Sequence, residues 1–143
     1  MNDLFATVYE LWIYNQDYQD IFQTMYDGND GLFSHYSLIG LLTLFVSLSA
    51  AIIFYFLIRY PYTKIWHWLL YAFGIGVFLV GGITYGYLQE SLIEFTQDSE
   101  MSDITNRIIL NYSVYNTVAF LLFFTGLSLV LKRVSKHQYH LPF

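Results

Sequence analysis

The segment Ile65–Leu88 reads IWHWLLYAFGIGVFLVGGITYGYL and contains no Asp, Glu, Lys or Arg. About 20 such residues are enough to cross the hydrocarbon core of a bilayer as an α-helix. Segments 37–58 and 108–131 reach the same length without a charged side chain. Hydrophobic residues make up 56% of the chain and charged residues 12%, which leaves too little polar surface to cover the buried helices of a soluble protein. We therefore predict an all-α integral membrane protein with three transmembrane helices, at 37–58, 65–88 and 108–131, in one domain over residues 1–143.

The charged residues are sorted between the two sides of these three segments. All eleven carboxylates precede the first segment or lie between the second and the third. Five of the six basic residues lie in the other two polar stretches, and Arg107 is the exception. Basic residues near a span tend to remain in the cytoplasm, so we expect the N-terminus outside and a basic cytoplasmic tail over residues 132–143. The five are Arg59, Lys64, Lys132, Arg133 and Lys136.

Residues 4–26 have the periodicity of an amphipathic helix, with apolar residues recurring three and four positions apart. The polar face carries Glu10, Asp17 and Asp20. Helices that bind anionic lipid usually carry Lys or Arg instead. We therefore expect this helix on the outer face, either as a cap on its own bundle or as a docking surface for a partner protein. Its apolar positions are Leu11, Tyr14, Tyr18, Ile21, Phe22 and Met25.

The connection between the second and third segments is mostly polar, with apolar residues at Leu88, Leu92 and Phe95. Spacings of four and three residues belong to one helix face, so we predict that the second helix continues for two turns beyond the membrane. Ser102 or Asp103 stands where a side-chain oxygen can cap the start of the third helix.

Small residues mark faces on which helices can pack closely. In lipid, helix association relies on close backbone approach at such residues, often in a GxxxG pattern. The two stripes serve either to pack the first two spans against each other or to make contacts between chains. The second span carries Gly74, Gly81, Gly82 and Gly86, and the first span carries Thr43, Ser47 and Ala51.

The third span carries polar residues in the half that follows the acidic connection. Ser113, Asn116 and Thr117 share one helix face, and Asn111 points away from Ser113. An amide in hydrocarbon needs a hydrogen-bond partner, which a neighbouring helix can supply. The alternative is a polar stripe that lines a pore in an oligomer.

The residues needed for most chemistry are missing. The chain has no Cys, and no span contains the charged side chain that marks the route of an ion pump. His35 and His67 lie at opposite ends of the spans, so we do not expect one chain to hold a haem between them. We predict no catalytic, metal-binding or cofactor-binding residues and do not expect an enzyme, and the basic tail is too short for nucleic acid.

The function that fits these features is that of a non-catalytic small membrane subunit, assembling through its small-residue helix faces with other membrane proteins or with itself. The alternative is a homo-oligomeric pore-forming or membrane-disrupting protein. The layout resembles that of three-span holins, the lysis pores of phages, which implies a bacterial inner (cytoplasmic) membrane; the resemblance covers layout alone, without a motif. A third possibility is a protein that blocks another membrane protein through its outer helix.

Overall fold

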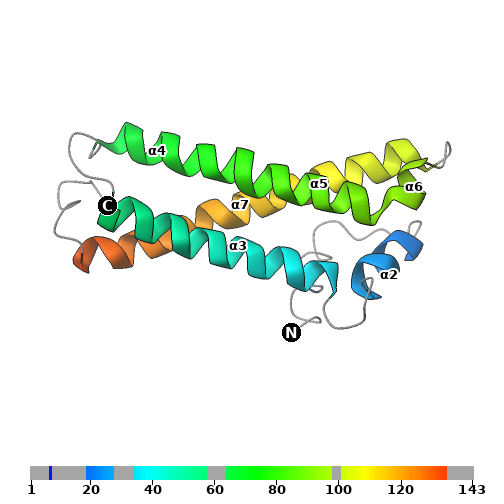
Figure 1. The fold of residues 1–143 in the computed structure, drawn as a ribbon, viewed down its shortest axis with the longest axis horizontal. Helices are drawn as coiled ribbons and strands as arrows, with labels where there is room; N and C mark the ends of the chain where they lie inside the picture. Colours follow the sequence, from blue (N-terminus) through cyan, green and yellow to red (C-terminus); the bar gives the residue numbers. More distant parts are fainter. Residues whose placement is uncertain (1–6, 8–18, 28–33, 58–63, 98–100, 135–143) are drawn as a thin grey trace.

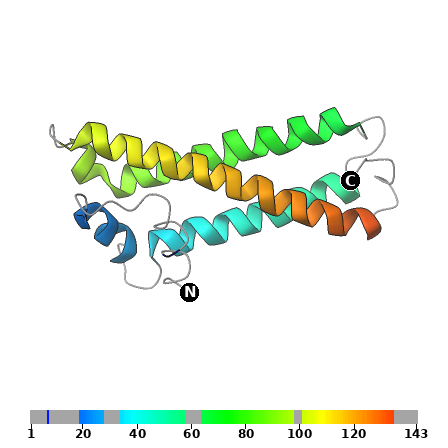
Figure 2. The same ribbon diagram turned by 180° about the vertical axis from the view of Figure 1, so that it is seen from behind.

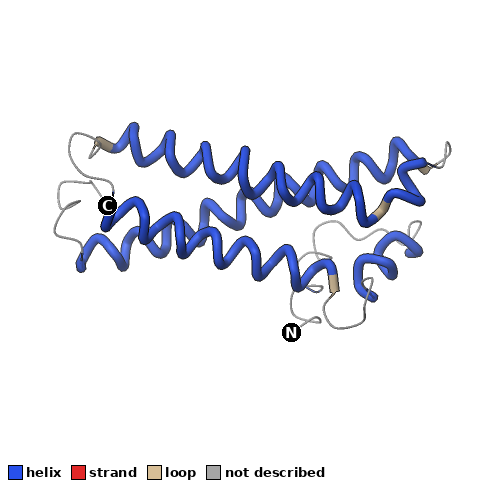
Figure 3. The backbone as a smooth tube through the Cα atoms, in the orientation of Figure 1, coloured by secondary structure: helices blue, strands red, loops and turns tan. Residues whose placement is uncertain are grey.

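The structure is a computed structural model that describes residues 7, 19–27, 34–57, 64–97 and 101–134. Helix is the regular secondary structure of these residues (Figure 3). The elements are α2 (Gln19–Asp27), α3 (His35–Ile52), the π-helix η2 (Ile53–Leu57), α4 (Ile65–Gly74), the π-helix η3 (Ile75–Gly81), α5 (Gly82–Ser91), α6 (Ile93–Gln97) and α7 (Ser102–Val134).

Three helical stretches are long and apolar enough to cross a membrane: His35–Leu57, Ile65–Ser91 and Ser102–Lys132. They lie side by side in an elongated bundle, and each runs antiparallel to the one before it (Figures 1 and 2). Large apolar side chains cover the outside, and Phe78 is 83% exposed. Water does not favour such a surface, whereas hydrocarbon does. The three predicted spans are confirmed in length and composition.

The bundle has one apolar core toward each end. The core at the α2 end joins α2 to Tyr36 of α3, Leu88 of α5 and Tyr112 of α7. The core at the Lys132 end is largely aromatic. It includes Phe54 of η2, Trp68 of α4, and Phe120 and Phe124 of α7. Polar side chains of all three spans lie between these two cores, and they form the candidate site.

The short helix α2 packs on one end of the bundle. Its apolar side chains Ile21, Phe22 and Met25 are buried, and Asp20 is exposed. This part of the predicted amphipathic helix therefore has the expected faces and caps its own bundle (Figure 1). Most of the predicted helix 4–26, including Glu10 and Asp17, lies outside the described residues.

The second helix differs from its prediction at its end. It does not continue for two turns, because α5 stops at Ser91 and Leu92 leaves the helical conformation, with φ −107° and ψ 26°. Leu92 is 1% exposed and packs in the α2-end core, so burying this side chain favours the bend. The next turn, α6, then packs against α7 instead of extending away from the bundle.

The third helix is longer than its apolar segment. It runs from Ser102 to Val134, so Ser102 and Asp103 both lie in its first turn, and the predicted cap at one of them is wrong. The first helix does have a side-chain cap, since Ser34 Oγ accepts a hydrogen bond from the Ser37 N–H. The turn between the first two spans lies outside the described residues, as does most of the tail 132–143.

Candidate functional site

Asn116 of α7 is fully buried and connects all three spans. Its Nδ2 donates a hydrogen bond of 2.7 Å to Thr84 Oγ1 on α5. Its Oδ1 accepts one of 2.6 Å from Thr43 Oγ1 on α3. The Thr43 hydroxyl also lies 2.9 Å from the carbonyl oxygen of Ile39, so its one proton is shared between two acceptors. We call Thr43, Thr84 and Asn116 the Asn116 node.

The Asn116 node fixes how the three helices sit against one another. An amide without partners in hydrocarbon is costly, and interhelical hydrogen bonds in membranes contribute about 0.6 to 2 kcal/mol each. Sliding any helix by one turn would separate the partners by ~5.4 Å. Because both ends of the amide are bonded within one chain, the node acts here as a structural connection between the spans.

A second polar contact lies one residue further along α7, where Thr117 meets η3. Thr117 Oγ1 donates to the carbonyl oxygen of Ser113 at 2.9 Å and lies 3.2 Å from that of Gly76. A Cβ at Gly81 would stand 2.8 Å from Thr117 Oγ1, and a Cβ at Gly76 would stand 3.1 Å from Phe120. Both glycines therefore permit the close approach of η3 and α7. Gly76 was not among the predicted packing residues.

The predicted small-residue positions divide into an inward and an outward set. Thr43, Ser47, Ala51 and Gly81 are buried in the bundle. Gly82 and Gly86 are exposed on α5, and Gly74 is half-buried at the end of α4. A Cβ added at any of these last three would meet no atom within 4 Å. Thr43, Ser47 and Ala51 lie on α3, and this helix packs mainly against α7 and less against the second span.

The predicted polar stripe divides in the same way. Ser113 and Asn116 are buried and Thr117 is half-buried, whereas Asn111 is exposed. Ser113 donates a hydrogen bond to the carbonyl oxygen of Ile109 in its own helix. The stripe without Asn111 therefore faces the interior of this bundle.

The aromatic core contains polar contacts that sequence analysis missed. Trp68 Nε1 donates to Ser128 Oγ at 3.2 Å, and Tyr71 donates to the carbonyl oxygen of Ala50 at 3.1 Å. Phe124 packs against the rings of Trp68 and Tyr71. The four-residue spacing of Trp68 and Ala72, both buried, was the available signal for this inward face.

His35 is buried at the start of α3, at the α2 end of the bundle. Its Nδ1 lies 2.7 Å from the hydroxyl of Tyr87, and no described residue offers a hydrogen-bond partner to its Nε2. The centroids of the His35 and Tyr87 rings are 5.4 Å apart. This pair joins α3 to α5, as the Asn116 node does nearer the middle of the spans.

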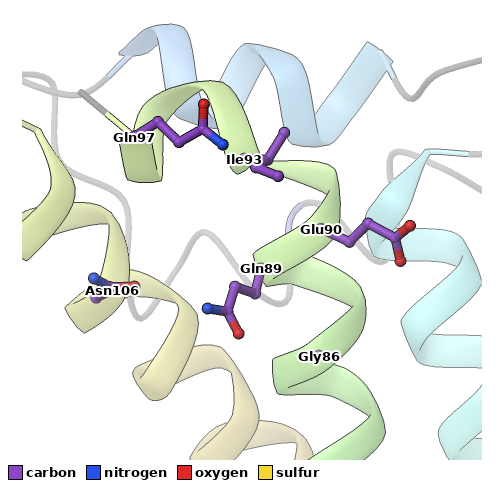
Figure 4. A pocket seen from close by; sticks show the side chains of 6 residues that line it. All are labelled: Gly86, Gln89, Glu90, Ile93, Gln97 and Asn106. Carbon is purple, nitrogen blue, oxygen red and sulfur yellow. The ribbon is translucent and has the colours of Figure 1, made fainter.

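A groove of about 480 Å³ opens at the α2 end of the bundle between α5, α6 and α7. Gln89 extends toward Asn106 of α7, whereas Glu90 points to the other side of α5, toward α3 (Figure 4). This groove was not predicted, because the bend at Leu92 that folds α6 over it was not predicted either. It is lined by Gly86, Gln89, Glu90, Ile93, Gln97 and Asn106.

Within the described ranges no three His, Asp or Glu side chains lie together as a metal site requires. The groove has one carboxylate in its lining, that of Glu90. Comparisons with protein-family models, with curated proteins and with solved structures found no match. Function is therefore inferred from the geometry of this chain.

Proposed function

We propose that this chain is a non-catalytic small membrane subunit that assembles with other membrane proteins, or with copies of itself, through a small-residue helix face. The observation that carries the proposal is the outward position of Gly82 and Gly86. These glycines stand in GxxxG register on α5, and space around both is open. In lipid, such a face lets a second helix approach closely.

The inward and the outward glycines of the second span differ in what surrounds them. Gly76 and Gly81 are accounted for by the contact between η3 and α7. Gly82 and Gly86 have no such contact within the described chain, yet glycine in a helix costs about 1 kcal/mol relative to alanine. Contact with lipid tails requires no glycine. A partner helix packed on this face would offset the cost.

The pore alternative receives less support. A pore lined by the third span needs polar side chains that face other copies or water. In this bundle Asn116 is bonded at both ends and Ser113 bonds to its own helix. Asn111 alone of the predicted stripe is exposed. We therefore favour the subunit over the pore.

We further propose a bacterial inner membrane, with the α2 end outside and the Lys132 end in the cytoplasm. Of the described basic residues, Lys64, Lys132 and Arg133 stand at one end of the spans, and Arg107 is the exception at the other. The described acidic residues, among them Asp20 and Asp103, stand at the other. This arrangement agrees with the retention of basic residues in the cytoplasm. Asp20, with Glu10 and Asp17, would then offer an acidic docking face to an outer partner.

The test is the native mass of the tagged chain, extracted from its own host in mild detergent. We expect the wild type in an assembly larger than its own 16.8 kDa, and expect Gly82→Leu with Gly86→Leu to release it. The matched control is Gly126→Leu, because Gly126 is also exposed and a Cβ there also meets nothing within 4 Å. If the double variant remains in the wild-type assembly, this face does not carry it.

A further inference from the structure

The groove at the α2 end is built from three elements (Figure 4). Gly86 leaves its base without a side chain, and Gln89 of α5 and Asn106 of α7 stand on its two sides. Beyond the bend at Leu92, α6 adds Ile93 and Gln97. Its volume of about 480 Å³ falls in the range of sites that hold small molecules.

The polar side chains of the groove have unused hydrogen-bonding capacity. Among the described residues, the side chains of Gln89, Glu90, Gln97 and Asn106 form no hydrogen bond and no ion pair. A carboxamide has two N–H donors and an oxygen that accepts. Three carboxamides around one groove therefore offer donors and acceptors together, and none of the three brings a charge.

The position of the groove sets where a ligand would come from. The apolar segments end at Leu88 in the second span and begin at Ile108 in the third. Apart from Gly86 at its base, the groove residues lie just beyond both segments, so in a bilayer they stand at the depth of the lipid headgroups. A headgroup can reach this site without leaving its own layer, and a solute can reach it from water.

We propose that the groove binds a neutral, hydroxyl-rich group of the sugar type, carried on a lipid or free in solution. Each hydroxyl is both a donor and an acceptor, which matches the facing carboxamides of Gln89 and Asn106. The lining contains no Lys or Arg, so a phosphate would lack the charged donors that bind it strongly. Ile93 supplies an apolar surface for the C–H groups of a sugar ring.

The experiment uses the chain expressed alone in detergent, so its outcome does not depend on any partner. Native mass spectrometry compares retention of a diglucosyl diacylglycerol with that of phosphatidic acid and phosphatidylcholine carrying the same acyl chains. We expect the glycolipid to be retained about tenfold more, as two or three added hydrogen bonds would give. Equal retention of the three lipids would overturn the proposal.

Variants locate the binding. Gln89→Leu with Asn106→Leu should abolish the preference, whereas Asn111→Leu, which removes an exposed carboxamide from α7 outside the groove, should keep it. Gly86→Leu should also abolish it by filling the base, and Gly82→Leu, one turn away, should not. A preference that survives the double change would place the lipid elsewhere and contradict the proposal.

A competition experiment distinguishes a sugar carried on a lipid from a free saccharide. Millimolar maltose should displace the glycolipid if a free saccharide is the ligand. Retention of the lipid against maltose, with the same dependence on Gln89 and Asn106, would assign the groove to a lipid-borne headgroup. Gly86 belongs both to the proposed assembly face and to the groove, so the other variants separate the two proposals. Gly82→Leu changes the assembly face and leaves the groove lining intact, and Gln89→Leu with Asn106→Leu changes the groove and leaves both glycines in place.

Discussion

The side-chain oxygen of Asn116 accepts a hydrogen bond of 2.6 Å from the hydroxyl of Thr43, which lies 73 positions earlier in the chain. The same amide donates to Thr84, so a single side chain joins the first, second and third spans. The Ser113 hydroxyl bonds within its own helix, and the Thr117 hydroxyl reaches the second span alone. The stability of the bundle should therefore depend on Asn116 more than on its polar neighbours.

Asn116→Leu should destabilise the bundle by about 1 to 3 kcal/mol, because it removes two hydrogen bonds and leaves two buried hydroxyls without the amide. Denaturation of the chain in mixed micelles with increasing SDS measures this change. Asn111→Leu on the exposed side of α7 is the control and should leave the transition in place. Equal effects of the two substitutions would show that the node contributes nothing of its own.

Thr43→Val tests whether the bond between Thr43 and Asn116 is the source of that effect. In a double-mutant cycle with Asn116→Leu, we expect a coupling energy of about 0.6 to 1.7 kcal/mol, the range measured for interhelical hydrogen bonds. The same SDS titration supplies the four stabilities. Strict additivity of the two substitutions would contradict a direct interaction.

Gly81 and Gly82 are neighbours in sequence with opposite surroundings. Gly81→Ala would place a Cβ 2.8 Å from Thr117 Oγ1, and overpacking of this kind costs about 1 to 3 kcal/mol. Gly82→Ala meets no atom within 4 Å and should be neutral or stabilise by up to about 1 kcal/mol. Thr117→Ala removes the opposing hydroxyl and should restore part of the stability of the Gly81→Ala variant. Thermal unfolding in detergent, followed by circular dichroism, measures the stability of all three variants. An unchanged stability of Gly81→Ala would mean that η3 and α7 are not in close contact.

The division between these two glycines shows what sequence reasoning could not supply. Length and lack of charge were enough to predict the three spans, because crossing hydrocarbon makes few other demands on a helix. The inward face of the second span could not be read from a 3.6-residue period, because η3 is a π-helix with wider turns over Ile75–Gly81. Gly81 and Gly82 point in different directions because neighbouring residues of a helix lie about 100° apart around its axis, whereas Gly82 and Gly86, four residues apart, share the outward face.

The hydrogen-bond partners of Asn116 on the other helices could not be predicted either. The sequence indicated that Asn116 needs a hydrogen-bond partner, but Thr84 stands alone among apolar residues and aromatic rings, with no pattern to select it. Finding it requires the relative register of two helices, which side-chain packing along both of them decides. The groove was missed for a related reason: its lining depends on the bend at Leu92, and the sequence alone does not show that this side chain is buried in the α2-end core.

Tyr87→Phe should loosen the α2 end of the bundle. It removes the partner of His35 Nδ1 and leaves a buried imidazole without a described hydrogen-bond partner on either nitrogen, at a cost of about 1 to 3 kcal/mol. Hydrogen exchange should rise in α2 and at the start of α3, and stay unchanged toward Lys132. Tyr85→Phe is the control, because Tyr85 is half-buried on the same helix and is not among the residues bonded to His35. Unchanged exchange at the α2 end in the Tyr87→Phe variant would count against a supporting role for this pair.

The proposed orientation can be tested with single cysteines, since the natural chain has none. Asp20, Asp103 and Arg133 are exposed, the first two at the α2 end and the third at the other. Retention of Lys and Arg in the cytoplasm predicts that a membrane-impermeant maleimide labels Asp20→Cys and Asp103→Cys in intact cells. Arg133→Cys should react only after the membrane is opened, and Lys64 and Lys132 remain to hold the orientation in that variant. Labelling of Arg133→Cys in intact cells, together with protection of the other two, would invert the topology and move both the groove and the acidic face of α2 to the cytoplasmic side.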